Sequence, residues 1–352
     1  MSALVFGFRR RGRIYLGRAE LSEAVKEAIA ISHDRRAFEA RRARDSIRAR
    51  AYGMAARLFD NGRDAFNTKT IGFTTDTIKA LLLDCSAPGT YLKLITGGVT
   101  NANPAVYTSA SHGFANNDVL VAGGIGGNLS ANQTGLAASV ATNTFQMTTL
   151  EGLAVAGSGA YTSGGYVIDL TQATFVAGIL GNRVGTDQTL AGKTSSRGVA
   201  NATSPITWPT VPAGNPVQAV VFYDAAGGSD ASNRVIAWQD GKVRVRVDKA
   251  VVATDTSIVV EPLRGQLWDG ATGPAPVIYW SDGHSSTLNA AANQGDSAIT
   301  ITSQAAGGVA LGSTADVTTF GAGLPVTPSG GSIAFSIGTI YAPTNPTGIY
   351  VL

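Results

Sequence analysis

Hydrophobic and polar positions follow a helical spacing in the first part of the chain. Ala and Arg dominate residues 19–59, and Pro is absent from this stretch. Four apolar side chains recur with the 4-3-4 spacing that places them on one helix face: Ile47, Ala51, Met54 and Leu58. The pattern predicts a long amphipathic helix over 19–59 that stops at Asn61-Gly62. Its narrow apolar seam indicates packing against a partner helix or against the rest of the chain.

From residue 71 onward the pattern changes to short apolar or alternating runs separated by Gly and Asn, which is typical of strands and turns. Residues 77–83 predict a buried strand, and 243–247, which alternate Val with Arg, predict a strand with one polar face. Glycine-rich stretches at 123–128 and 157–159 predict loops. The other runs that predict strands are 118–122, 144–148, 166–170, 217–223, 234–239 and 332–341.

A weak internal repeat lies in the last third of the chain. Residues 255–263 resemble residues 296–303, about 40 positions further on, and each copy precedes a turn that contains Gly. The copies are too different for a solenoid. They predict two hairpins of one small β module that spans roughly 250–318.

These patterns together predict a mainly β protein with a sandwich-like β core, two inserted small β modules and a basic N-terminal α-helix. The expected parts are a helical arm (1–57), a core assembled from three segments (58–95, 166–241 and 319–352), a first inserted module (96–165) and a second inserted module (242–318).

Charge separates the arm from the rest of the chain. The segment 1–63 holds 15 of the 27 Lys and Arg and 7 of the 24 Asp and Glu, a net charge of +8. The rest of the chain holds 12 basic and 17 acidic side chains, a net charge of −5. Because interface cores are depleted of charged residues, the weakly charged body predicts burial against neighbouring subunits. A surface rich in Thr, Ser and Asn is the alternative.

The basic arm is the strongest candidate for an anchoring site. The expected anchor consists of Arg35, Arg36, Arg41, Arg42, Arg44, Arg48 and Arg50, with Ile47, Met54 and Leu58 as the apolar seam. The arginines are expected to pair with acidic protein partners, and neutralisation of phosphates on packaged DNA is the alternative.

Catalytic chemistry has little support in the sequence. One cysteine and three histidines allow no intrachain disulfide and no zinc site of the usual spacing. Gly192-Lys193-Thr194 resembles the end of a phosphate loop, but position 187 is Asp where that motif needs Gly. Asp282, His284 and Asp296 form only a weak acid–base or metal candidate. We therefore expect no enzyme activity, no cofactor and no metal site.

The tryptophans are interpreted as packing residues, and a carbohydrate-stacking platform is the less favoured alternative; they are Trp208, Trp238, Trp268 and Trp280. Arg9-Arg10-Arg11 follows the first apolar run rather than preceding it, unlike in a secretory signal. No apolar run approaches the roughly 18 residues that span a bilayer. The chain is expected to fold in a cytosol and to make no membrane contact.

Several blocks of the chain resemble, in the same order, a family of small virion proteins of tailed bacteriophages. Residues 76–84 look like the family's DTIKVALLD block, and residues 323–331 look like its GLPVTPNGG block. The other similar blocks are 58–66, 190–194, 198–199, 219–224 and 236–238. Members of this family are short. By this resemblance, roughly 96–165, 242–320 and the arm are additions to the family core.

The resemblance implies a structural protein of the virion, made in the cytoplasm of a bacterial host, with no catalytic residues to carry over. Capsid decoration or a head–neck accessory role is expected first, and a tail or baseplate accessory role next. The expected partners are other copies of the chain and other virion proteins, such as the major capsid, portal, neck or tail proteins. The alternative is a receptor- or carbohydrate-binding tail fibre or spike protein, with or without depolymerase activity.

Overall fold

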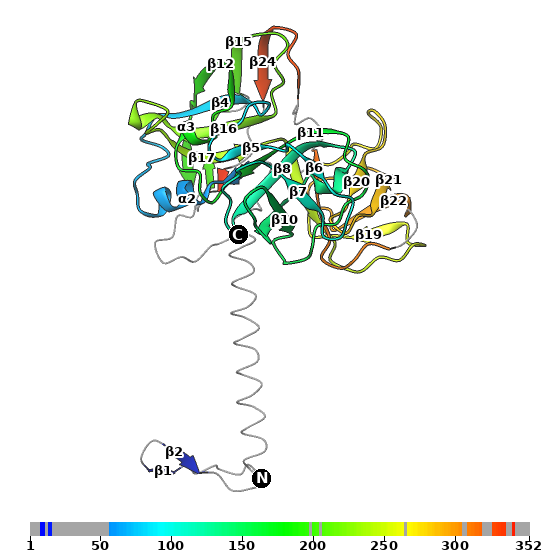
Figure 1. Cartoon of the computed structure of the whole chain (residues 1–352). Helices are drawn as coiled ribbons and strands as arrows, with labels where there is room; N and C mark the ends of the chain where they lie inside the picture. The colour runs from blue at the N-terminus through cyan, green and yellow to red at the C-terminus, as the bar shows by residue number, and fades with distance from the viewer. Residues whose placement is uncertain are drawn as a thin grey trace. The chain divides into compact units, whose positions relative to one another are not determined.

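The computed structural model describes residues 8–10, 13–15, 56–196, 199–203, 206–263, 266–304, 308–318, 326–335 and 340–341. The chain divides into two compact units, Met1–Arg48 and Ala49–Leu352. In the first unit the structure describes one antiparallel hairpin, formed by β1 (Phe8–Arg10) and β2 (Arg13–Tyr15). The second unit holds the other described elements, and its described strand pairs are all antiparallel (Figure 1).

A five-stranded sheet, here called the core sheet, organises the second unit. Its strands, in spatial order, are β12 (Asn182–Thr189), β4 (Ile78–Asp84), β16 (Ala219–Asp224), β17 (Arg234–Gln239) and β3 (Ala56–Leu58). The three central strands are almost continuously apolar because both faces of the sheet are buried. Along β4, Leu82 points into one apolar cluster, while its neighbours Leu81 and Leu83 point into the other.

Small elements cover one face of the core sheet. They are α2 (Asp60–Asn67), β15 (Ile206–Val211) and β24 (Gly331–Phe335), and β15 pairs with β24. Trp208 of β15 is fully buried in the apolar cluster on this face. The short helix α3 (Val176–Ile179) lies in the cluster on the opposite face.

A seven-stranded sheet packs against that opposite face and closes on itself. Its strands, in spatial order, are β5 (Leu92–Leu94), β11 (Ser163–Asp169), β8 (Val119–Gly126), β9 (Thr134–Ala138), β10 (Thr144–Thr148), β7 (Val106–Thr108) and β6 (Gly98–Val99). The two outermost strands, β5 and β6, belong to one continuous segment, 92–99. This segment pairs with β11 at one end and with β7 at the other, so the sheet forms a barrel. The name barrel is used below for residues 92–169.

Side chains of the barrel alternate between its interior and its outer wall. On β8, Leu120 and Ala122 point inward, into a cluster that includes the stacked rings of Tyr107 and Phe145. Their neighbours on β8 point outward, into the cluster shared with the core sheet. The barrel wall and the core sheet are therefore two facing β layers. The structure confirms a mainly β, sandwich-like protein.

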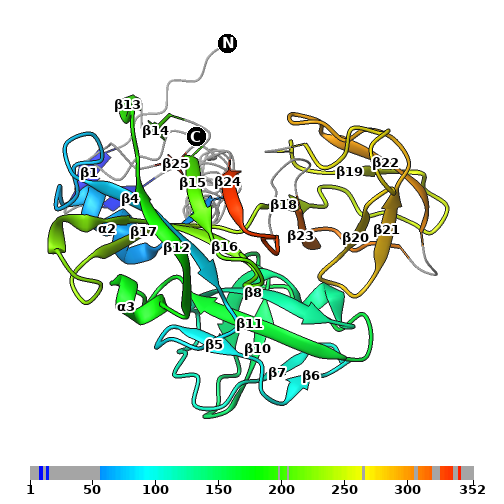
Figure 2. The same ribbon diagram turned by 90° about the horizontal axis from the view of Figure 1, so that it is seen from above.

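A third set of strands, here called the 242–318 body, is seen in Figure 2. It has an apolar cluster of its own around Trp280. It contains a two-stranded sheet, β18 (Lys242–Arg246) with β23 (Thr314–Thr318), and a four-stranded sheet of β19 (Ser257–Val259), β22 (Ala298–Gln304), β21 (Ser285–Leu288) and β20 (Val277–Tyr279). The two repeat copies do not form separate hairpins, because β19 pairs directly with β22. The first copy buries Ile258 and Val260, and the second buries Ile299 and Ile301, in the same apolar cluster.

The remaining described elements are short. A three-stranded sheet consists of β13 (Thr194–Ser196), β14 (Val199–Asn201) and β25 (Ile340–Tyr341). Two single-turn 3₁₀ helices occupy Leu129–Ala131 and Ala225–Gly227.

The helix stop expected at Asn61-Gly62 is wrong, because both residues lie inside α2. Two further local predictions are wrong. The helical spacing extends to residue 59, but Ala56–Leu58 is strand β3, in which Leu58 pairs with Ala237. Pairing with the edge of β17 outweighs the helical pattern there. The glycine-rich stretch that predicts a loop from residue 123 continues β8 as far as Gly126. Glycine is needed here because a Cβ on Gly123 would lie 2.6 Å from the hydroxyl of Tyr166.

Candidate functional site

The most unusual feature of the described body is a network of buried charges where the core sheet, the barrel and the 242–318 body meet. Arg57 of β3 lies at its centre and is 2% exposed. Its guanidinium lies 2.6 Å from Oδ1 of Asp240, which directly follows β17, and 3.1 Å from Oδ2 of Asp316 on β23. One side chain of the core sheet therefore bridges to the 242–318 body.

Asp316 extends the network to the barrel. Its Oδ2 also accepts a hydrogen bond from the hydroxyl of Thr134 on β9. Burial by itself would raise the pKa of the Asp316 carboxyl, but the positive charges of Arg57 and Arg244 outweigh burial and lower it. Asp316 is therefore a carboxylate at neutral pH, held by groups from all three bodies.

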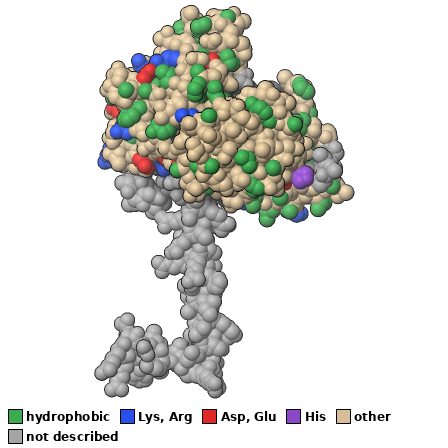
Figure 3. Space-filling view, in the orientation of Figure 1, with side chains coloured by type: hydrophobic (Ala, Val, Ile, Leu, Met, Phe, Trp, Pro, Cys, Tyr) green, Lys and Arg blue, Asp and Glu red, His purple; other side chains and the backbone are tan. Residues whose placement is uncertain are grey.

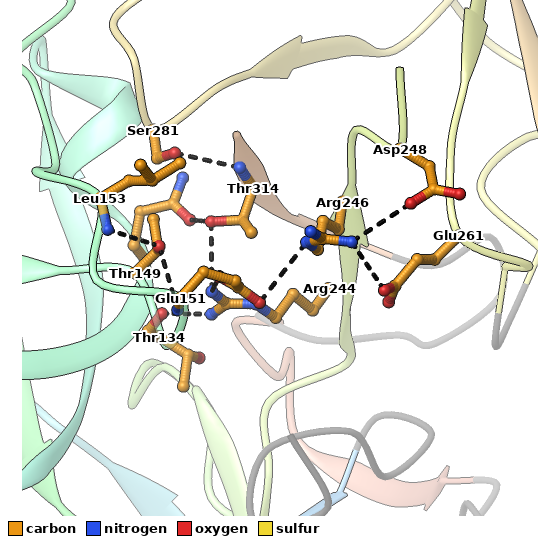
Figure 4. Close-up of polar contacts among 11 residues, drawn as sticks. Thr134, Thr149, Glu151, Leu153, Arg244, Arg246, Asp248, Glu261, Ser281 and Thr314 are labelled. Atoms are coloured by element: carbon orange, nitrogen blue, oxygen red, sulfur yellow. Dashed lines mark hydrogen bonds and ion pairs between the residues drawn. The ribbon is translucent and has the colours of Figure 1, made fainter. Parts of the chain in front are cut away.

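Arg244 makes the second link between the barrel and the 242–318 body (Figure 4). It lies on β18 and donates to the backbone carbonyl of Thr134. It also donates to Oγ1 of Thr314, at 3.2 Å, and pairs with Glu151 of the barrel at 3.4 Å. The predicted polar face of β18 therefore exists, but at Arg244 it is buried against the barrel instead of facing solvent.

Arg246 brings the network to the surface. Its Nε lies 3.7 Å from Glu151, and its Nη1 lies 2.9 Å from Glu261 and 3.3 Å from Asp248. The Asp248 side chain is 57% exposed, whereas that of Glu151 is 9% exposed. Because exposed pairs contribute little, the buried part of the network dominates its energetics.

Neutral hydrogen bonds reinforce the same junction. Thr314 and Ser281 exchange backbone and side-chain hydrogen bonds at 2.7 Å and 3.0 Å. The carbonyl of Ser281 accepts from the backbone N–H of Ala156 in the barrel, at 2.7 Å. Gln133 of the barrel donates to the carbonyl of Tyr279, at 3.4 Å. The barrel and the 242–318 body are thus joined by backbone as well as by charge.

This arrangement is suited to fastening. The carboxylates of Asp240, Asp316 and Glu151 all face arginines. Within the part of the chain that the structure describes, no three His, Cys, Asp or Glu side chains come together in a way that could hold a metal ion. The network instead fixes how three β bodies meet.

Of the ten expected anchor residues, the structure describes only Leu58. The other nine lie outside the described residues: Arg35, Arg36, Arg41, Arg42, Arg44, Arg48, Arg50, Ile47 and Met54. Leu58 packs against an apolar cluster of the core sheet. Its assignment to a helical seam is therefore wrong.

The weaker catalytic candidates have structural roles. Asp282 accepts hydrogen bonds from Ala310 N at 2.7 Å and Ser313 Oγ at 2.9 Å, and it pairs with His284. Asp296 accepts the backbone N–H of Asn293 in a turn. The ammonium group of Lys193 donates to a backbone carbonyl, that of Asp76. The packing role of the tryptophans is confirmed, since three are fully buried and Trp268 packs on the core of the 242–318 body.

Sequence reasoning missed the residues that make the network. The alternation of Val and Arg in β18 was a usable signal, because arginines on one face of a strand need partners if that face is covered. Arg57 gave no signal, since it looks like one more charge of a basic helix. Glu151 and Asp316 lie in Thr- and Gly-rich surroundings that resemble any solvated turn.

No protein-family model matches this chain, and comparison with curated proteins finds no match. None of the helices among the described residues is long and apolar enough to cross a membrane.

Proposed function

We propose that this chain is a non-enzymatic structural protein of a tailed-bacteriophage particle, in a capsid-decoration or head–neck accessory role first and a tail or baseplate accessory role next. The observation that carries the proposal is the position of the blocks that resemble the phage family. Blocks 76–84, 219–224 and 236–238 lie on the adjacent strands β4, β16 and β17, and block 58–66 adds the end of β3 and most of α2. Segments far apart in sequence thus form one continuous unit.

The other segments form bodies of their own around this unit. The barrel leaves the core sheet after β4 and returns through α3 to β12, the neighbour of β4. The 242–318 body begins directly after β17. Such additions fit a protein whose work is geometric, because they enlarge its contact surface without disturbing the core sheet.

Surface composition supports a role in assembly. Few charged side chains are visible on the face shown in Figure 3, and they gather mostly over the part that contains α3 and β12. We expect the partners to be other copies of the chain and other virion proteins. The net charge of +8 on the segment 1–63 adds an acidic neighbour or packaged DNA as the partner of the arm.

The test is to locate the chain in purified particles. We expect mass spectrometry to find it as a stoichiometric virion component, and the particle map to place it on the shell or neck with interfaces of at least about 1,000 Å². Density at the distal tip of the tail, together with binding or cleavage of host polysaccharide, would support the receptor-binding alternative. Absence from the particle would overturn both roles.

A further inference from the structure

Two aspartates lie together at one end of the barrel, away from the ion network. Asp118 directly precedes β8, and Asp169 ends the neighbouring antiparallel strand β11, where it is in register with Leu120. Asp169 is 0% exposed and Asp118 is 5% exposed. Buried aspartates normally have a cationic partner.

Each carboxyl group caps a turn, and Gln172 contacts both. Oδ1 of Asp169 accepts the backbone N–H groups of Thr171 at 2.8 Å and Gln172 at 2.9 Å. Oδ2 of Asp118 accepts the backbone N–H of Ala115 at 2.6 Å and the side-chain amide of Gln172. The other oxygen of Asp169, Oδ2, is buried and has no hydrogen-bond donor among the described residues.

Among the described residues, no positively charged side chain pairs with either carboxyl group. On α2, Arg63 pairs with Asp60 at 2.9 Å. On the barrel side lie the bases Lys93 of β5 and His112. The pKa of His112 is lowered first by burial and also by the charge of Lys93. Within the described part of the chain, neither Asp118 nor Asp169 has a cation within ion-pair distance.

Two buried carboxylates without a cation cannot both be ionised cheaply. Burial, and then the charge of Asp118, raise the pKa of Asp169 to about 7, although the N–H groups of residues 171 and 172 act in the opposite direction. The titration belongs to the pair, because the two groups interact.

We propose that Asp118 and Asp169 share one proton, which Oδ2 of Asp169 carries and donates to Asp118. The proton comes from solvent and returns to solvent when the pair ionises, and no other bond changes. It gives the buried Oδ2 the partner that it otherwise lacks, and it removes the repulsion between the two groups.

The turn that follows Asp169, residues 170–172, also holds α2 through hydrogen bonds. The backbone N–H of Asp60 donates to the carbonyl of Leu170 at 2.8 Å, and the side-chain amide of Asn61 donates to the carbonyl of Thr171 at 3.1 Å. Thr171 Oγ1 also donates to Asp60 at 3.2 Å. Since α2 directly follows β3, the pair makes the attachment of this corner of the core sheet to the barrel sensitive to pH.

The direction of the effect follows from proton linkage. When the turn opens, Asp169 becomes solvated and its pKa falls to the ordinary value near 3.9, whereas the closed turn retains the proton up to about pH 7. The equilibrium constant for opening should therefore rise by up to about tenfold per pH unit between roughly pH 4 and 7, and should level off above that range.

Native-state hydrogen exchange of the full chain tests this, with the amides of Thr171 and Gln172 as probes after correction for intrinsic exchange. The wild type should show the slope. Asp169→Asn should abolish it, because its amide, like the protonated acid, presents an acceptor oxygen and a hydrogen-bond donor but does not titrate. Asp84→Asn is the matched control, since Asp84 is also buried and caps a turn through Ser86 N. It should keep the wild-type slope.

A flat wild-type profile, or the same slope in Asp169→Asn, would overturn the proposal. A slope that millimolar Ca²⁺ removes would also overturn it, because the unpartnered oxygen would then belong to a cation site. If Asp169→Asn does not fold, infrared spectroscopy of the wild type decides: the proposal requires a protonated-carboxyl band at pH 6 that disappears by pH 9.

Discussion

Arg57 neutralises two carboxylates that would otherwise be buried charges. Burial alone would lower the pKa of the Arg57 guanidinium. The negative charges of Asp240 and Asp316 outweigh burial, so the pKa is raised. A buried ion network of this kind adds little net stability compared with an apolar contact. We expect it to add specificity of geometry, because the arrangement of the three bodies seen here pairs Asp240, Asp316 and Glu151 with arginines.

Replacing Arg57 with Met should therefore be strongly destabilising. The apolar side chain fills similar space but leaves Asp240 and Asp316 buried without their shared cation, which costs about 3–5 kcal/mol. Denaturant titration of the full chain measures this loss. Arg183→Met is the control, because the Arg183 side chain is 30% exposed and its pairs contribute about 0–1 kcal/mol. Equal losses in the two variants would contradict the prediction.

Asp316 should make the protein sensitive to acid. Its pKa is lowered in the folded state, so its contribution to stability is present above the unfolded value near 3.9 and is lost as the pH falls through the folded value. Asp316→Asn should thus be less stable than wild type at pH 7, and the difference should shrink below about pH 4. Denaturation midpoints at pH 7, 5 and 3 give the comparison. A gap that stays constant across this series would show that Asp316 does not titrate as expected.

Helix α2 depends on a glycine where it meets β17. A Cβ on Gly62 would lie 2.6 Å from the carbonyl oxygen of Val235 and 2.9 Å from Cα of Ile236. These are backbone atoms, so neither can turn aside. Gly62→Ala should cost about 1–3 kcal/mol through overpacking, partly offset by about 1 kcal/mol of helix propensity. Thermal denaturation with Asn67→Ala, at an exposed position of the same helix, as the control measures the effect; a stabilised Gly62→Ala variant would refute it.

Strands whose pattern of apolar and polar side chains depends only on neighbouring residues could be predicted from the sequence. The strands at 144–148 and 234–239 have the expected bounds, and β4 begins one residue later than expected. Elements governed by distant partners could not be predicted. Residues 123–126 look like a loop because their glycines make room for Tyr166, which belongs to a later strand of the barrel. Residues 56–58 look helical until β17, from a distant part of the chain, pairs with them.

The same distinction applies to the site. The packing of the tryptophans could be predicted from the sequence. The ion network could not, since it joins residues that lie far apart in the sequence, such as Arg57 and Asp240. The sequence does not show whether a given charged residue will be buried in an ion pair with a residue of another body.

The boundary between arm and body can be tested with two truncations. Removal of residues 1–55 leaves β3 and Arg57 in place, whereas removal of residues 1–58 takes both away. We expect the shorter deletion to keep the denaturation midpoint of the body, and the longer one to lose about 3–5 kcal/mol because Asp240 and Asp316 lose their cation. If the arm is the anchor, the shorter deletion should also fail to join the particle. Incorporation at the wild-type copy number would contradict that role.

The closed barrel restricts how neighbouring molecules can bind to this part of the protein. A sheet with open edges can recruit a strand from another chain through backbone hydrogen bonds, without regard to sequence. Segment 92–99 occupies both edges that the seven-stranded sheet would otherwise expose. Any neighbour that binds the barrel must therefore recognise its side chains and their shape. If copies of the chain lie side by side on one surface, as proposed, this closure favours contacts that depend on sequence over indiscriminate strand exchange.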